Sequence, residues 1–512
     1  MICVMDTMAA ALWELFGNQK LKGLLGAMRQ TLLKLEKAGH VDSQWFNAMG
    51  EVNLMERNFG MAARYFQNAL DEKSAPEYEL NLGNALFYAG DIQGAKRILG
   101  LHMGKYPGDM HALVNLANCH LQVGETEKAK SLCMKGLEEK GAKSPLYNCL
   151  GQTAFLQGDF EGAWEEFNRA YVESPDFIDA LFNRGNMAYR LDRADEAQRD
   201  FAMCLRKDEN FAPAQLNLAM IHLERGELTL GRQRAQAALK LLPGSVDALH
   251  MLGRIHLAAK DFRLARDAFR EALRTDGEHV STQIALARLN ILEEEPEEAL
   301  QSLKKVMGKG NPDPEETLAA LSLLLELGEH SLCVHHLEKN SGDLSAEFRK
   351  ILVLSLWREG RTKDAIGHLE RLLQAQGESA ETLTLLARML MQSGAEGLAE
   401  VRLLRALELD PSFRPAAFEM ARIQMERGEG QKALPILQAI VEHHPQDSDC
   451  LYNLACCHSA NHNLQESLEC LEKALANGFQ DFDKISGDKD LDYIRQFKEF
   501  NQLAGQMTGR LA

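Results

Sequence analysis

The densest group of residues that could bind a metal lies near the C-terminus. It contains Cys450, Cys456, Cys457, His458 and Cys470. Zinc sites usually use two pairs of ligands, each pair two to four residues apart, whereas Cys456 and Cys457 are adjacent and would diverge by about 100° on a helix. We therefore expect these thiols to pack as small apolar residues, with no bound metal or other cofactor. A metal or redox protein that uses this group is the alternative.

The chain carries no recognisable catalytic motif. A phosphate-binding glycine loop, a dinucleotide fingerprint, a nucleophile elbow and a metalloprotease motif are all missing from its 512 residues. The net charge of −17 disfavours nucleic acid, because a nucleic-acid binder needs a basic surface to displace counterions. No run of about 18 apolar residues could span a membrane, and the N-terminus lacks the basic start of a signal peptide. We expect a non-enzymatic cytoplasmic protein with reduced thiols.

Two series of polar residues suggest a binding surface. The first series is Asn81, Asn115, Asn183 and Asn217, spaced by 34 or 68 residues. The second begins with Asn84, Asn118, Gln152 and Asn186, and arginines follow at Arg254, Arg288, Arg388 and Arg422. An asparagine amide both donates and accepts hydrogen bonds, so a row of amides could hold a peptide backbone. Arginine binds carboxylates or phosphates through paired donors, which indicates an acidic ligand.

A 34-residue pattern must position these side chains. Small residues recur at this interval at Gly83, Ala117, Gly151, Gly185, Ala219, Gly253 and Ala287. Thirteen repeats then begin at residues 43, 76, 110, 144, 178, 212, 246, 280, 314, 346, 380, 414 and 448. Apolar residues at three- and four-residue spacing predict two amphipathic helices in each repeat. Glycine at position 15 of eight repeats predicts the turn between them, and proline at position 32 predicts the end of the second helix.

The pattern resembles the tetratricopeptide repeat. That family has bulky residues at positions 4, 7 and 11, small residues at 8, 20 and 27, and proline at 32. The fourth repeat matches with Tyr147, Leu150, Gly151, Ala163, Phe167, Ala170 and Pro175. The resemblance implies an all-α, right-handed superhelical solenoid with capping helices at both ends. It also implies that positions 2, 5, 6, 9, 12 and 13 line a concave groove, which holds both polar series.

The asparagines at position 6 resemble those in the repeats of protein O-GlcNAc transferases, which grip the backbones of their substrates. No glycosyltransferase domain follows here, so the resemblance implies binding without catalysis. The alternative is that the asparagines bond to neighbouring helices, and that the arginines pair with acidic residues of the chain itself. The two-carboxylate clamp of some related repeats is not expected, because Leu80, Pro145 and Cys149 replace its residues.

The ends of the array and one irregular repeat define further segments. Residues 1–42 contain an amphipathic stretch that would cap the first repeat, with a membrane-surface helix as the alternative. Repeats 1–8 cover residues 43–313, a degenerate repeat covers 314–345, and repeats 10–13 cover 346–480. The ninth repeat has Leu321 and Cys333 where small residues belong, so we expect a weak joint near 309–345. Residues 481–512 would cap the other end through Phe479, Leu491, Ile494 and Phe497.

These features predict a scaffold or adaptor that holds a peptide or partner segment in its groove. A regulatory or targeting subunit of an enzyme or secretion complex, close to a membrane through residues 1–42, is the second hypothesis. We expect a protein ligand with acidic groups, and we expect neither nucleic acid nor membrane as a partner.

Overall fold

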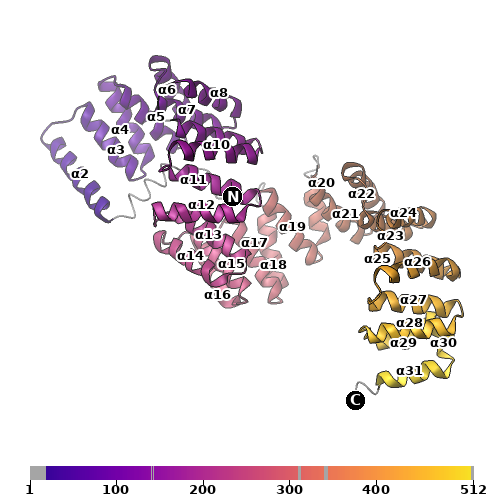
Figure 1. The fold of residues 1–512 in the computed structure, drawn as a ribbon. Coiled ribbons are helices and arrows are strands. Elements are labelled where there is room, and N and C mark those ends of the chain that lie inside the picture. The colour runs from indigo at the N-terminus through magenta and orange to yellow at the C-terminus, as the bar shows by residue number, and fades with distance from the viewer. Residues whose placement is uncertain (1–18, 140, 142, 309–312, 340–343, 509–512) are drawn as a thin grey trace. The chain divides into compact units, whose positions relative to one another are not determined.

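A computed structural model describes residues 19–508 except 140, 142, 309–312 and 340–343. All regular structure in these ranges is helical, and consecutive helices pack as antiparallel pairs, which confirms the all-α solenoid (Figure 1). The first helices of the repeats are α3 (Ser43–Met55), α5 (Pro76–Tyr88), α7 (Met110–Gln122), α9 (Ser144–Leu156), α11 (Ile178–Arg190), α13 (Ala212–Glu224), α15 (Val246–Ala258), α17 (Val280–Leu292), α19 (Pro314–Glu326), α21 (Ala346–Arg358), α23 (Ala380–Gln392), α25 (Arg414–Glu426) and α27 (Ser448–Ala460). Each begins at the residue where the 34-residue pattern starts a repeat.

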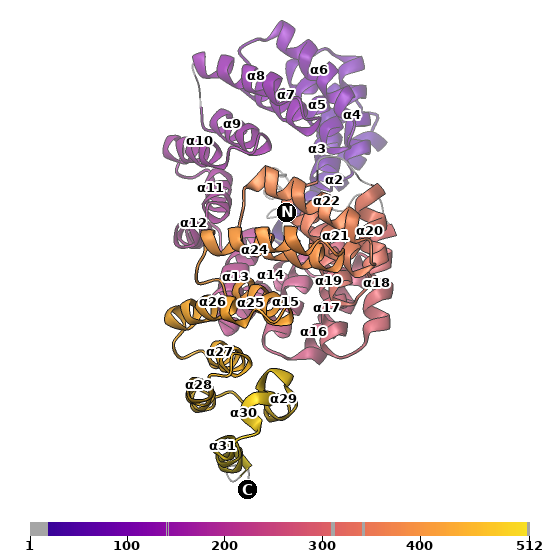
Figure 2. The same cartoon turned by 90° about the vertical axis from the view of Figure 1, so that its right-hand side faces the viewer.

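The second helix of each repeat packs back along the first. These helices are α4 (Phe59–Glu72), α6 (Ile92–Lys105), α8 (Thr126–Glu138), α10 (Phe160–Glu173), α12 (Ala194–Lys207), α14 (Leu228–Leu241), α16 (Phe262–Thr275), α18 (Pro296–Gly308), α20 (His330–Lys339), α22 (Thr362–Gln376), α24 (Glu396–Leu409), α26 (Gly430–His443) and α28 (Leu464–Ala476). Figure 2 shows the succession of pairs from another side. Where proline occupies position 32, as at Pro107 and Pro175, the second helix has ended two residues earlier.

Every repeat turns between its helices through a left-handed residue at position 15. Eight of these residues are glycines, for example Gly226 with φ 72°. The other five repeats place a residue with a side chain in the same conformation: Arg57, Asp192, Lys260, Glu294 and His462, with φ between 58° and 62°. The turn geometry therefore persists where the glycine signal is missing. The five side-chain-bearing residues carry the strain that glycine avoids.

The two helices of a repeat cross closely where position 8 is glycine. A Cβ atom added to Gly151 would lie 2.6 Å from the ring of Phe167, and one added to Gly185 would lie 2.8 Å from the ring of Phe201. The aromatic residue at position 24 thus occupies the space that the missing side chain leaves. Phe167 and Phe201 are fully buried there. In the ninth repeat Leu321 is also fully buried, so this pair accommodates a large residue at position 8.

A buried ion pair interrupts the apolar core of the fifth repeat. Arg184 on α11 donates to both carboxylate oxygens of Asp200 on α12, at 2.8 and 2.6 Å. Its third contact is to Asn168 on α10 at 2.7 Å, and its guanidinium lies over the ring of Tyr171. Arg184 occupies position 7, where the family pattern has a bulky apolar residue. The sequence pattern did not predict this polar junction of three helices.

Both ends of the repeat array are covered. At the N-terminal end, α2 (Gln19–Lys37) packs against α3 through the buried Leu25 and Leu32, and Trp45 Nε1 donates to the Leu32 carbonyl at 2.8 Å. Residues 1–18, to which part of the capping prediction refers, lie outside the described residues. At the other end are α29 (Phe482–Gly487), η1 (Lys489–Leu491), α30 (Asp492–Arg495) and α31 (Lys498–Thr508).

The C-terminal helices bury most of the residues expected to seal that end. Phe479, Leu491 and Ile494 join the core that α27 and α28 begin. Phe497 is only half-buried, beside the ring of Tyr493, and Phe500 takes the deeper place. The difference arises because α31 starts at Lys498, so its first inward-facing aromatic residue is Phe500.

The chain divides into two compact units, residues 1–289 and 290–512, with the boundary inside α17. Each unit is a stack of helix pairs with its own core. This boundary precedes the degenerate ninth repeat, so the weak joint near 309–345 stays a prediction. Hydrogen exchange that is no faster in α19 and α20 than in α15 and α16 would contradict it.

Candidate functional site

The first helices of successive repeats form one continuous face within each unit. Contacts join α5 to α7, α7 to α9 and α13 to α15 in the first unit, and α23 to α25 and α25 to α27 in the second. Since the first helices approach one another in this way, their side chains at positions 6 and 9 meet across repeat boundaries. Both predicted polar series lie on this first-helix face.

The position-6 asparagines bond to the preceding repeat. Asn115 Nδ2 donates to Asn84 Oδ1 at 2.5 Å, and Asn217 Nδ2 donates to Asn186 Oδ1 at 2.6 Å. In both pairs the donor is at position 6 and the acceptor at position 9 of the repeat before it. The two predicted series are therefore partners of each other. One amide N–H of Asn115 and one of Asn217 are therefore used within the protein.

The other residues of the two polar series form different hydrogen bonds. Asn81 and Asn183 donate at 3.0 Å to position 5 of the preceding repeat, at Asn47 and Asn148. Cys149 replaces asparagine at position 6 of the fourth repeat and donates through its thiol to Asn118 Oδ1 at 3.0 Å. Gln152 is half-buried and also has a polar partner. Sequence reasoning missed Asn47 and Asn148 because asparagine occurs at position 5 in only two of the thirteen repeats.

Burial separates the asparagines into two groups. Asn183 and Asn217 are each 5% exposed. Asn81 and Asn115 are half-buried, as are their neighbours Asn84 and Asn118. The two buried side chains serve chiefly to join repeats, because little of their surface can meet a ligand. Ligand contact by the asparagine series stays a prediction.

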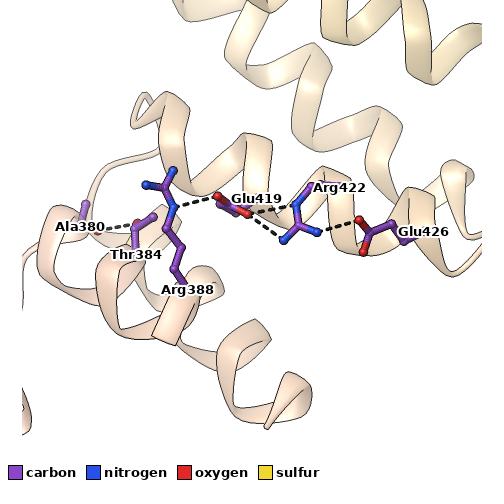
Figure 3. Close-up of polar contacts among 6 residues, drawn as sticks. All are labelled: Ala380, Thr384, Arg388, Glu419, Arg422 and Glu426. Atoms are coloured by element: carbon purple, nitrogen blue, oxygen red, sulfur yellow. Dashed lines mark hydrogen bonds and ion pairs between the residues drawn. The ribbon is translucent and has the colours of Figure 1, made fainter. Parts of the chain in front are cut away.

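Two of the four arginines are neutralised by acidic residues of the same face (Figure 3). Arg388 Nε lies 2.7 Å from one carboxylate oxygen of Glu419, and Arg422 binds the other oxygen at 3.0 and 3.2 Å. Arg422 also donates to Glu426 at 2.7 Å. Burial lowers the pKa of Arg422, but the hydrogen bonds to Glu426 and Glu419 outweigh it and the net shift is upward. Glu419 occupies position 6, the position at which the sequence predicts asparagines as the binding residues.

The other two arginines have different surroundings. Arg254 on α15 is half-buried and Arg288 on α17 is exposed, and neither forms an ion pair with any residue that the structure describes. In the sequence, position 6 of the following repeat is alanine in both cases, at Ala285 and Ala319. These two guanidinium groups therefore lack a carboxylate at the place where Glu419 neutralises Arg388.

A polar cluster lies beside Arg254. His250, one turn earlier on α15, has its Nδ1 atom 3.0 Å from Thr282 Oγ1, and His279 Nδ1 lies 2.7 Å from the same oxygen. Burial, with the positive charge of Arg254 and the nearby His279, lowers the pKa of His250 to about 3. His250 is therefore neutral at physiological pH, and the positive charge at this part of the face comes from arginine.

The C-terminal cysteines lie in packed cores. Cys456 belongs to the core that includes Tyr452 and Phe479, whereas Cys457 packs against α26 and Cys450 against α25 and α26. Burial raises the pKa of Cys457 and of Cys450 to about 12, which disfavours the thiolate needed to bind a metal. Across the described ranges no group of three or more histidine, cysteine or acidic side chains is arranged to hold a metal ion. Within the same ranges, no helix has the length and hydropathy that a membrane span requires.

The fold and the first-helix face define a helical-repeat protein whose regular geometry comes from stacked helix pairs. Family models described as tetratricopeptide repeat match residues 250–314, 352–412 and 424–485. These three ranges therefore consist of tetratricopeptide repeats.

Several curated proteins are similar to parts of the chain. Protein O-mannosyl-transferase TMTC3 of Homo sapiens is 24% identical over 334 residues, which is 62% of this chain and 33% of TMTC3. A chloroplastic protein of Arabidopsis thaliana is 34% identical over 84 residues, covering 16% of this chain and 25% of that protein. Hsp70-Hsp90 organizing protein 1 of Glycine max is 21% identical over 231 residues, or 38% and 40% of the two chains. The matched region thus spans between a quarter and two fifths of these relatives. The comparisons give no specific support to the O-GlcNAc transferase resemblance.

Solved structures show the same kind of fold. A monomeric mutant of IFIT1 with Gppp-AAAA has a TM-score of 0.43 at 15% identity, covering 78% of this chain and 96% of its own. A tetratricopeptide repeat protein from Parabacteroides merdae has a TM-score of 0.41 at 17% identity, covering 49% and 98%.

Proposed function

We propose that this chain is a non-catalytic cytoplasmic scaffold that holds an acidic segment of a partner protein on the first-helix face of the seventh and eighth repeats. The observation that carries the proposal is the contrast among the four arginines. Arg388 and Arg422 share the carboxylate of Glu419, whereas Arg254 and Arg288 have no carboxylate partner among the described residues. An acidic ligand would supply the carboxylate that Glu419 supplies to Arg388 and Arg422.

The chemistry of arginine favours this ligand class. A guanidinium group presents a planar fork of donors that matches a carboxylate or phosphate. Such pairs are worth more where part of the surrounding water is excluded, as at the half-buried Arg254. The asparagine pairs support the proposal differently, because they hold successive repeats in a fixed relation and so keep the binding face rigid.

The test compares two matched double variants. Arg254→Gln with Arg288→Gln removes the unpaired charges, and Arg388→Gln with Arg422→Gln removes the same number of charges from the paired network. Each protein, after circular dichroism has shown that its helix content is unchanged, would be cross-linked in cell lysate and its partners identified by mass spectrometry.

We expect the first variant to lose partners that the wild type and the second variant retain, with cross-links mapping to α15 and α17. Acidic segments should predominate among the cross-linked peptides. Equal capture by all three proteins would overturn the proposal.

A further inference from the structure

A second basic surface lies on the second helices of the sixth and seventh repeats. Helix α14 contains three basic residues and no acidic residue, and α16 contains four basic and two acidic residues; both helices are described in full. Five of the basic residues fall at positions 21, 25 and 29, which follow one another at four-residue spacing along a helix. They are Arg232 and Lys240 on α14, and Arg266, Arg270 and Arg274 on α16. Both helices pack against α15 and lie next to it in Figure 1.

Most of this basic surface is free to meet a ligand. Arg232, Lys240, Arg270 and Arg274 are exposed, and none of the four forms an ion pair within the described part of the chain. Two arginines at position 26 of other second helices are paired: Arg169 binds Glu166, and Arg405 on α24 binds Glu408. On α24, moreover, positions 21 and 29 hold Glu400 and Glu408. The basic column is thus a feature of these two repeats within an acidic protein.

Apolar side chains lie at the start of both helices. Leu230 on α14 is 46% exposed and Leu264 on α16 is 48% exposed, and both occupy position 19 of their repeats. Exposed leucines beside unpaired arginines resemble the composition of protein interfaces, which are enriched in arginine and apolar contacts. The surface therefore offers two apolar contacts and four unpaired positive charges.

The pattern of charges favours a protein over other polyanions. Asp267 and Glu271 are exposed on α16 between the arginines. These carboxylates would repel the continuous phosphates of a nucleic acid or an anionic membrane, whereas a protein segment can place uncharged residues opposite them. Along the fully described α14 and α16, no exposed aromatic side chain is available to stack on bases.

We propose that α14 and α16 form a second docking site, separate from the first-helix face, for an acidic protein segment that also carries apolar residues. Positions 21 to 29 span about 12 Å along each helix, and both helices pack against the same helix, α15. A segment of a few acidic residues could therefore contact both helices at once, with its apolar residues against Leu230 and Leu264.

The test uses a fluorescent polyglutamate peptide as the probe and measures its binding by anisotropy at low and at physiological salt. The site variant is Arg232→Gln with Arg270→Gln and Arg274→Gln, all at exposed positions. The control variant is Arg388→Gln with Arg422→Gln, whose charges Glu419 and Glu426 already neutralise. Phosphatidylserine vesicles and an oligouridylate RNA serve as competing polyanions.

We expect the site variant to bind the peptide at least ~10-fold more weakly than wild type, and the control variant to retain most of the affinity. Equal binding by the site variant and the wild type would overturn the proposal. If affinity were lost only in a separate variant with Arg254→Gln and Arg288→Gln, acidic-peptide binding would belong to the first-helix face, and this result would likewise overturn the proposal. Stronger binding to the vesicles or the RNA than to the peptide would overturn the choice of a protein ligand.

Discussion

The side-chain amide of Asn217 donates a hydrogen bond to Asn186 Oδ1 across the boundary between the fifth and sixth repeats, at 2.6 Å. Arg388 and Glu419 meet at the equivalent positions of the eleventh and twelfth repeats, at 2.7 Å. The chain thus uses the same geometric relationship with two kinds of chemistry, a neutral pair in the first unit and a charged pair in the second. Both position-9 side chains are engaged by the repeat that follows.

Replacing Asn217 with alanine should weaken the joint between two repeats. The half-buried Asn186 would lose its donor, at a cost of about 1–2 kcal/mol. Urea unfolding would measure the loss, and hydrogen exchange should localise it to α11 and α13. The control is Asn453→Ala at position 6 of the last repeat, because Arg422 before it is already occupied by Glu419 and Glu426. Equal losses in both variants would contradict a specific role for the Asn217 bond.

The stability of the first unit should depend on the protonation of Asp179. Burial raises the pKa of this carboxyl to about 7, and a backbone hydrogen bond opposes the shift only in part. A raised folded-state pKa means that the contribution of Asp179 to stability is fully present below its ordinary pKa of 3.8 and is lost as the pH rises through about 7.

Asp179→Asn should therefore stabilise the protein at pH 8 by on the order of 1–3 kcal/mol and change little below pH 4. Thermal unfolding across this pH range would measure the difference. The exposed Asp267→Asn serves as the control and should show no such gain. A destabilised Asp179→Asn variant at pH 8 would refute the prediction.

The left-handed residues at position 15 should respond to substitution in opposite directions. Lys260 has φ 60°, so Lys260→Gly should relieve strain and stabilise the seventh repeat by roughly 0.5–1 kcal/mol. Gly226 has φ 72°, and Gly226→Ala should destabilise the sixth repeat by about 1 kcal/mol. Thermal unfolding would test both, with Lys260→Ala as the control that removes the amine but keeps the strain. A gain in Lys260→Ala as large as in Lys260→Gly would show that charge, not backbone strain, is responsible.

The buried pair of Arg184 and Asp200 should be costly to break on one side. Asp200→Ala leaves the guanidinium without its bidentate acceptor and should destabilise the protein by about 3–5 kcal/mol. The double variant Arg184→Met with Asp200→Leu restores an apolar core and should recover much of that loss. Chemical unfolding of Arg184→Met, of Asp200→Leu and of the double variant would measure the coupling. Additive losses would mean that the two side chains do not depend on each other.

The helix pairs could be predicted from the sequence, whereas the side-chain contacts between successive repeats could not. The repeat starts, the glycine turns and the contact of Gly151 with Phe167 follow from a period that local physics repeats in each unit. The hydrogen-bond partner of a position-6 side chain does not follow from this period, because the partner depends on the rotation between successive repeats. Asn115 meets position 9 of the preceding repeat, whereas Asn183 meets position 5.

The acidic partners of the arginines show the same limit. Glu419 lies at position 6, and only its short distances to Arg388 and Arg422 in the structure show that it neutralises both arginines. Charge pairing is a property of pairs of positions, so reading one column at a time could not separate Arg388 from Arg254.

The close crossing at position 8 has a consequence for inheritance. Gly50, Gly83, Gly151, Gly185 and Gly253 all lie against a bulky side chain of their partner helix, with no room for a Cβ atom. Every missense change of a glycine codon adds at least that atom. Any amino-acid replacement at these five glycines should therefore displace a helix of its pair. Such variants should reduce the amount of folded protein in the cell, even though none of the five residues lies at a proposed binding site.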